Sequence, residues 1–250
     1  MSANELIVIG CGVLGKRIFD NWQGKFLGIV RSQDSLNELS ATGISGSTKI
    51  PSGLSLESVI FATSGSPNQL SAVEQFVSLN PKFSGTAILI SSTSYYQGVQ
   101  GPVNETSAGG NTPRSIACQK LEHAFKSSFD AGWILRCGGL FEAGRGPFAY
   151  LSRTGQIPPL PTGQQLALFS YRDLQRLVLI LLKEKTKQVS TLLCTLRNCP
   201  TRYDYYSAAF SKLNIPFDLS ATAPCGPQYE PEKLYRIFEA LDSDWDAALQ

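Results

Sequence analysis

The chain has 250 residues, with 22 lysines and arginines, 20 aspartates and glutamates, and a formal net charge of +2. So small an excess of positive charge produces no strong field for attracting nucleic acid or a membrane surface. The apolar runs also fall far short of the roughly 18 residues that a membrane-spanning helix needs. We therefore expect neither kind of partner, and a chain of this length suits one α/β domain with a large buried core.

The six cysteines are dispersed along the chain without a Cys-x-x-Cys pair, and the single histidine is His123. Metal sites are built from clustered ligands, so the sequence predicts no metal. The opening residues, MSANEL, do not show the basic and then apolar pattern of a secretory signal. We expect a cytoplasmic protein with reduced thiols, and the sequence leaves a homodimer open.

A glycine pattern near the start of the chain is the basis for predicting a dinucleotide-binding turn. The apolar run 6–9 is typical of a strand buried on both faces, and it leads into three glycines spaced G-x-G-x-x-G. In a dinucleotide-binding turn, these glycines permit a tight turn, a close approach of the backbone to the diphosphate, and close packing of the following helix. An ordinary glycine-rich turn is the alternative. The residues predicted to surround the diphosphate are Gly10, Gly12, Val13, Leu14 and Gly15.

The end of the second predicted strand, 26–30, bears on which dinucleotide binds. Arg31 and Ser32 follow this strand directly, at the position that faces the adenosine ribose in such folds. An arginine there pairs with a 2′-phosphate, so we favour NADP over NAD. Asp34 is a rival that would favour NAD, although a helix N-cap explains it as well.

Two further apolar runs end in small polar residues. Runs 59–62 and 87–90 predict the fourth and fifth strands, and a short third strand is expected between residues 43 and 48. Ligands of parallel sheets bind at the carboxyl ends of the strands. The residues predicted to reach the cofactor there are Ala62, Thr63, Ser64 and Ser91. Together the runs predict an α/β fold of the Rossmann-like type, a doubly wound parallel sheet.

The fifth predicted strand ends in a recognisable segment, S-S-T-S-x-Y-x-G at residues 91–98. This segment resembles the extended and atypical short-chain dehydrogenase/reductases, the NAD-dependent epimerase/dehydratase family. Four later stretches resemble segments of that family in the same order: 104–106, 135–145, 170–174 and 200–206. The resemblance spans nearly the whole chain. It implies an NAD(P)-dependent oxidoreductase or epimerase whose substrate is a small-molecule polar carbonyl or alcohol.

One family feature is missing from the chain. The family's enzymes carry Tyr-x-x-x-Lys on the helix after the fifth strand, where the tyrosine exchanges a proton with the substrate. On the corresponding helix, expected at about 114–126, those positions hold Arg114 and Cys118. The sequence therefore leaves open a cofactor-binding sensor without turnover, and also non-redox chemistry on the same fold.

Four residues remain as catalytic candidates. The resemblance places Ser92 and Thr93 where a hydroxyl would orient the substrate oxygen, and strand-end capping explains them equally well. Tyr96 is a candidate acid/base, but an unassisted phenol titrates at about pH 10, so a packed aromatic is the favoured alternative. Arg114 would supply the cation that such a phenol needs, or would bind an anionic substrate.

The C-terminal part of the chain is less regular than the rest. We expect a single domain, 1–250, in which residues 140–165 and 198–250 form a small substrate-binding lobe. The composition of residues 146–160 predicts a loop that lines this lobe. The segment 224–250 is expected to end in a helix-like tail.

Overall fold

The computed structural model describes residues 5–53, 58–159, 161–184, 186–240 and 244–250. The chain divides into two compact units. The first unit contains residues 1–91, 117–135 and 175–191, and the second contains residues 92–116, 136–174 and 192–250. Both segments of the predicted substrate lobe belong to the second unit, with residues 160 and 241–243 outside the described part. That these segments bind substrate stays a prediction.

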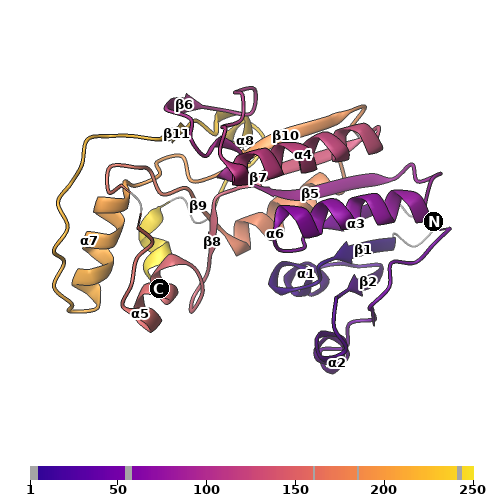
Figure 1. The fold of residues 1–250 in the computed structure, drawn as a ribbon. Coiled ribbons are helices and arrows are strands. Elements are labelled where there is room, and N and C mark those ends of the chain that lie inside the picture. Colours follow the sequence, from indigo (N-terminus) through magenta and orange to yellow (C-terminus); the bar gives the residue numbers. More distant parts are fainter. Residues whose placement is uncertain (1–4, 54–57, 160, 185, 241–243) are drawn as a thin grey trace. The chain divides into compact units, whose positions relative to one another are not determined.

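A seven-stranded sheet is the centre of the fold (Figure 1), with strand order β10-β7-β5-β4-β1-β2-β3. Its strands are β1 (Glu5–Ile9), β2 (Lys25–Ile29), β3 (Gly46–Ser47), β4 (Ser58–Phe61), β5 (Thr86–Ser92), β7 (Gly132–Cys137) and β10 (Val189–Cys194). Strand β1 pairs in parallel with both β2 and β4, and β4 pairs in parallel with β5. This parallel pairing and the reversal of strand order at β1 and β4 confirm the predicted doubly wound sheet.

Helices accompany the strands in the order that a parallel sheet requires. They are α1 (Val13–Phe19), α2 (Gln33–Ala41), α3 (Ser66–Leu79), α4 (Pro113–Ser128) and α6 (Tyr171–Leu181). A group of phenylalanines fills the first unit, where the Phe61 ring meets Phe76 and Phe125 edge-on at 5.6 and 6.0 Å. All four residues of β4 are buried, so both faces of the strand are covered, which explains why the run 58–61 contains almost no polar residue. None of the helices in the described residues is both long and apolar enough to cross a membrane.

The second unit is built from short elements. They are the 3₁₀ turn η1 (Thr93–Tyr96), β6 (Gly101–Val103), β8 (Gly139–Phe141), α5 (Pro147–Thr154), β9 (Leu168–Ser170), α7 (Arg202–Lys212), β11 (Pro227–Tyr229), α8 (Glu232–Tyr235) and η2 (Trp245–Leu249). Two parallel pairs of strands, β6 with β11 and β8 with β9, join segments that are far apart in the sequence. Neither pair was foreseen, because strands of three residues carry too little periodicity to be recognised.

The loop predicted at residues 146–160 is wrong for its first part, because the structure forms helix α5 at Pro147–Thr154, whereas residues 155–159 form neither helix nor strand. Pro147 occupies the first turn, where a missing N–H costs nothing, and Leu151 is fully buried. Gly155 ends the helix in the left-handed conformation, with φ of 64°. The glycines and prolines that suggested a loop are therefore the start and stop signals of a short helix.

Candidate functional site

The turn after β1 brings two strand ends into backbone contact. Gly10 has φ of +88°, and its N–H donates to the Ile29 carbonyl at 2.9 Å. A Cβ at this position would lie 2.4 Å from the Thr63 nitrogen. Only glycine satisfies both the backbone angle and the close approach, so the turn at the end of β1 requires this residue.

The other two glycines of the turn differ in their surroundings. Gly12 is exposed, and a Cβ there would have only the Gly10 carbonyl oxygen nearby, at 4.0 Å. Gly15 is buried, and a Cβ there would lie 2.7 Å from the Cys11 sulfur. The open space at Gly12 suits a ligand that contacts the backbone, and the missing side chain at Gly15 lets α1 pack closely on β1. Leu14 is buried beside them and Val13 is half-buried. A ligand at this turn would therefore contact the main chain of these residues rather than their side chains.

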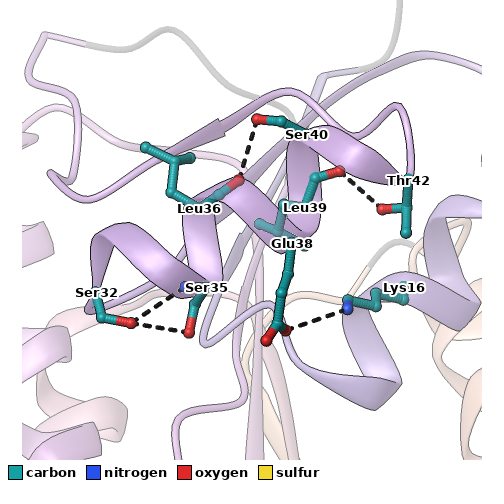
Figure 2. Close-up of polar contacts among 8 residues, drawn as sticks. All are labelled: Lys16, Ser32, Ser35, Leu36, Glu38, Leu39, Ser40 and Thr42. Carbon is teal, nitrogen blue, oxygen red and sulfur yellow. Dashed lines mark hydrogen bonds and ion pairs between the residues drawn. The ribbon is translucent and has the colours of Figure 1, made fainter.

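The segment after β2 presents Arg31 and Ser32, both exposed. Figure 2 shows that the Ser32 hydroxyl caps helix α2, accepting from the Ser35 N–H at 3.2 Å and lying 3.0 Å from the Ser35 hydroxyl. Asp34 lies in the first turn of α2 and is not its N-cap. The same view shows the Lys16 ammonium 3.8 Å from the Glu38 carboxylate, which links α1 to α2.

The carboxyl ends of β4 and β5 hold the other predicted cofactor residues. Ala62 and Thr63 contact the end of β1, where their N–H and hydroxyl donate to the Ile9 carbonyl at 2.8 and 3.5 Å. Ser64 is exposed. The Gln69 amide ties the two strands together by donating to the Ile90 carbonyl at 2.8 Å and the Phe61 carbonyl at 3.3 Å. The polar residues expected at this edge of the sheet therefore lie at strand ends within one unit.

Ser91 has a partner that the sequence did not reveal. Its hydroxyl donates to the Glu122 carboxylate at 2.7 Å, and only 2% of the Glu122 surface is exposed. Glu122 lies on α4, four residues after Cys118. A carboxylate this deeply buried needs hydrogen-bond donors, so the Ser91 hydroxyl stabilises it. Nothing in the sequence indicated the burial of Glu122 or this pairing.

In the second unit, the hydroxyls of Ser92 and Thr93 begin the η1 turn. The Ser92 hydroxyl accepts from the Ser94 N–H at 3.1 Å, so the capping role left open by the sequence is observed for Ser92. Thr93 is the first residue of η1, directly after the Ser92 cap. Both residues are only partly buried. Their role in orienting a substrate stays a prediction.

Tyr96 is fully buried, and its hydroxyl both donates and accepts a hydrogen bond within the protein. It donates to the Asn104 carbonyl at 2.6 Å and accepts from the Arg136 guanidinium at 2.6 Å. The guanidinium carbon of Arg136 also lies 3.4 Å from the centre of the Tyr95 ring. This cation–π and hydrogen-bonded arrangement stabilises a buried cation, since Arg136 is only 1% exposed. Proton transfer by Tyr96 stays a prediction, but the packed alternative accounts for each of these contacts.

Arg114 was expected to assist Tyr96, but the cation that contacts Tyr96 is Arg136. Arg114 is exposed in the first turn of α4. The sequence offered a signal for Arg136, because this residue lies in one of the stretches that resemble the epimerase/dehydratase family. Cys118 is buried, and its sulfur is hydrogen bonded to the Ser66 hydroxyl at 3.3 Å.

The chain matches no family model, and it matches no curated protein. Among solved structures, a conserved protein of unknown function from Silicibacter pomeroyi superposes with a TM-score of 0.78 at 15% identity, covering 98% of this chain and 96% of that one. A protein assigned as an NAD-dependent epimerase/dehydratase from Methylobacillus flagellatus gives 0.72 at 14% identity, covering 99% and 96%.

A third similar structure is the human epimerase family protein SDR39U1, isoform 2, solved with NADPH. Its TM-score is 0.72 at 16% identity, and 98% of this chain and 97% of that one are covered. Identities this low establish the fold alone. The predicted Rossmann-like α/β fold is therefore confirmed, and it is the fold of NAD-dependent epimerase/dehydratase structures.

Proposed function

We propose that the chain is an NADP-dependent oxidoreductase or epimerase that acts on a small polar carbonyl or alcohol. The observation that carries this proposal is the turn from Gly10 to Gly15. Its first glycine joins two strand ends, its second leaves open space beside bare backbone, and its third admits the helix. Those three properties are what a diphosphate-binding turn needs. The fold shared with the NADPH-bound human protein supports the same cofactor class.

The residues at the strand ends have separate roles in this proposal. The turn residues Gly10, Gly12, Val13, Leu14 and Gly15 surround the diphosphate, and Ala62, Thr63, Ser64 and Ser91 lie along the rest of the dinucleotide. Arg31 and Ser32 contact the adenosine ribose, where the guanidinium pairs with a 2′-phosphate and so favours NADP. When bound, the nicotinamide supplies or accepts hydride.

The second unit supplies the groups that hold the substrate. Thr93, with Ser92 beside it, orients the reacting oxygen through its hydroxyl. Arg114, which is exposed, binds an anionic part of the substrate. Tyr96 is the weaker candidate for proton transfer, because both hydrogen-bonding directions of its hydroxyl are already used inside the protein.

Nucleotide binding tests the proposal directly. Titration calorimetry with NADPH and with NADH is compared for the wild type and Arg31→Ala. We expect NADPH to bind at least tenfold more tightly than NADH, and this preference to vanish in Arg31→Ala. Lys82→Ala is the matched control, because it removes one exposed positive charge from the same unit at the opposite ends of the strands. Equal affinity of the wild type for both nucleotides contradicts NADP, and no binding of either contradicts the whole proposal.

A second function is a protein that binds NADP(H) without turnover, as a sensor or regulator. The missing Tyr-x-x-x-Lys favours it, together with the internal hydrogen bonds of Tyr96. The two functions differ in whether NADPH is consumed. A panel of aldehydes, ketones and keto sugars, followed by NADPH absorbance, separates them: oxidation that depends on one carbonyl compound supports the enzyme, and tight binding without oxidation supports the sensor.

A further inference from the structure

Arg202 is a buried cation of the second unit that the proposed function does not use. It is the first residue of α7, and only 4% of its surface is exposed. The first three N–H groups of α7 donate to the Gln164 carbonyl, the Thr162 carbonyl and the Thr201 hydroxyl, at 2.8, 2.9 and 3.1 Å. These contacts fix the start of the helix and occupy its N–H groups, so the group that can bind a ligand here is the Arg202 side chain.

The guanidinium of Arg202 lies beside neutral groups. Its Nη2 donates to the Pro158 carbonyl at 2.9 Å, and its central carbon lies 5.1 Å from the centre of the Tyr206 ring. Burial raises the pKa of Tyr206, against the opposing effect of Arg202, so this phenol is neutral at physiological pH. Among the residues that the structure describes, no carboxylate forms an ion pair with Arg202. A carbonyl and a phenol therefore leave its positive charge uncompensated.

The environment of Arg202 differs from that of Arg136, another buried arginine of this unit. Arg136 donates to the Tyr96 hydroxyl at 2.6 Å and lies 3.4 Å from the centre of the Tyr95 ring, so close contacts within the protein stabilise its charge. Arg202 has a carbonyl at 2.9 Å and a more distant ring at 5.1 Å. A buried charge costs free energy unless it is paired. An anion from outside the protein would complete the environment of Arg202.

The protein that covers the Arg202 guanidinium is a thin surface segment. Pro158, whose carbonyl accepts from the guanidinium, is itself exposed, and so are Gln156 and Pro159. Residues 155–159 form neither helix nor strand, so this segment can shift without breaking a helix or a sheet. A ligand that takes the place of the Pro158 carbonyl reaches the guanidinium directly from the surface, and the released carbonyl then meets water.

We propose that Arg202 binds a phosphate or carboxylate group of the substrate in place of the Pro158 carbonyl. This inference rests on the proposed function, because it names the class of carbonyl compound that the second unit holds. A guanidinium presents N–H donors in one plane, and pairs of them match two oxygens of a phosphate or a carboxylate. Water screens a buried charge less than an exposed one, so Arg202 should contribute more to substrate affinity than the exposed Arg114 does.

Thermal unfolding of the full chain tests whether the charge of Arg202 is unpaired. We expect sodium phosphate, compared with sodium chloride at equal ionic strength, to raise the unfolding midpoint of the wild type by about 2 °C or more. Arg202→Met should unfold no lower than the wild type in chloride, because removal of an unpaired buried charge removes its desolvation cost. It should also respond less to phosphate. Arg197→Met is the matched control and should keep the full response, because Arg197 is an exposed arginine of the same unit, 4.6 Å from the Tyr235 ring.

Carbon NMR of the Pro158 carbonyl locates the bound anion. In protein labelled with ¹³C at the proline carbonyls, the resonance that disappears in Pro158→Ala belongs to Pro158. It should move when sodium phosphate or sodium acetate is added, because the carbonyl loses its donor, and it should already be moved in Arg202→Met. Movement with phosphate alone assigns a phosphorylated substrate, and movement with acetate alone assigns a carboxylate. Arg202→Lys keeps the charge but loses the planar donors, so it should need about tenfold more anion for the same shift.

The outcomes separate this inference from the proposed function. A Pro158 resonance that neither anion moves, or a phosphate response that is undiminished in Arg202→Met, overturns the anion site. An Arg202→Met protein that unfolds about 5 °C or more below both the wild type and Arg197→Met in chloride also overturns it, because the charge is then compensated within the protein. A panel in which anionic and neutral carbonyl compounds react equally well overturns the substrate class. A wild type whose Pro158 resonance responds to anions but that binds no nucleotide keeps the anion site and removes the proposed oxidoreductase function.

Discussion

The two units of this chain present different kinds of candidate site. The first unit offers backbone: in the turn after β1, Gly12 is exposed and leaves open space beside the main chain. The second unit offers side chains, which gather around Arg136, Tyr96 and Tyr229. Backbone sites of this kind bind groups common to many ligands, such as a diphosphate. Side-chain sites distinguish one substrate from another, so we expect cofactor binding to depend on the first unit and substrate selection on the second.

Replacement of glycines in the turn gives the largest expected effect and tests whether the first site is made of backbone. Gly10→Ala forces a Cβ to 2.4 Å from the Thr63 nitrogen at φ of +88°. We expect a loss of about 4 kcal/mol or more in the free energy of unfolding. Gly12→Ala should change that free energy by less than about 1 kcal/mol, while weakening NADPH binding at least tenfold. Urea unfolding and calorimetry measure the two quantities.

These outcomes separate two explanations of the glycine pattern. An ordinary glycine-rich turn predicts that Gly12→Ala binds NADPH as well as the wild type does. A stable Gly10→Ala protein would show that the backbone around β1 and β4 adapts, and would remove the reason for glycine at that position.

The second expected effect concerns the buried cation of the other unit. Arg136→Met keeps much of the side-chain length but removes the donor to the Tyr96 hydroxyl and the charge above the Tyr95 ring. We expect the free energy of unfolding to fall by about 3 kcal/mol. Arg145→Met is the control, since Arg145 is exposed and lies 3.4 Å from Glu142. If both variants lose equally little stability in urea, the second unit does not depend on its side-chain network.

The contrast between the units also explains what could be predicted from the sequence. The strands 6–9, 59–62 and 87–90 are unbroken apolar runs, and the structure places strands there, because burial on both faces leaves no room for polar residues. The glycine turn could also be predicted, because all its parts lie within six residues of one another. Local patterns specify local structure, and that was enough for the fold of the first unit.

The second unit could not be predicted in the same way. The Tyr229 ring meets the Tyr96 ring because β11 pairs with β6, and Arg136 meets Tyr96 across 40 positions of sequence. Strands of three residues and contacts between distant segments leave no periodic signal. Helix α5 was missed for a related reason, since Pro147 and Gly155 occur in loops as well as at helix ends. Arg136 lies in the stretch 135–145 that resembles the epimerase/dehydratase family, but its burial could not be inferred.

Alkaline conditions should weaken both units through buried thiols. Burial raises the pKa of Cys11 in the first unit, and of Cys199 in the second, to about 11 from an ordinary value of 9.0. The unfolded chain ionises first, so the stability is complete below about pH 9 and is lost as the pH rises toward 11. Each thiol accounts for up to about 2–3 kcal/mol. Urea unfolding at pH 8 and pH 10.5 should show this fall, and Cys11→Ala and Cys199→Ala should each reduce it. An unchanged fall in both variants would contradict the assignment to these thiols.

The smallest expected effect tests whether surface charges matter to the first unit at all. The Lys16 ammonium and the Glu38 carboxylate, drawn in Figure 2, are 3.8 Å apart, and 37% and 71% of the two side-chain surfaces are exposed. Water and salt screen such a pair, and two long side chains lose freedom to form it, so Glu38→Gln should cost about 0.5 kcal/mol or less. Urea unfolding at low salt and in 0.5 M NaCl measures this cost, which should disappear at high salt. A loss above about 1.5 kcal/mol would mean that α1 and α2 are held by this charge pair. The first unit would then depend on side chains as the second does, and the contrast between them would fail.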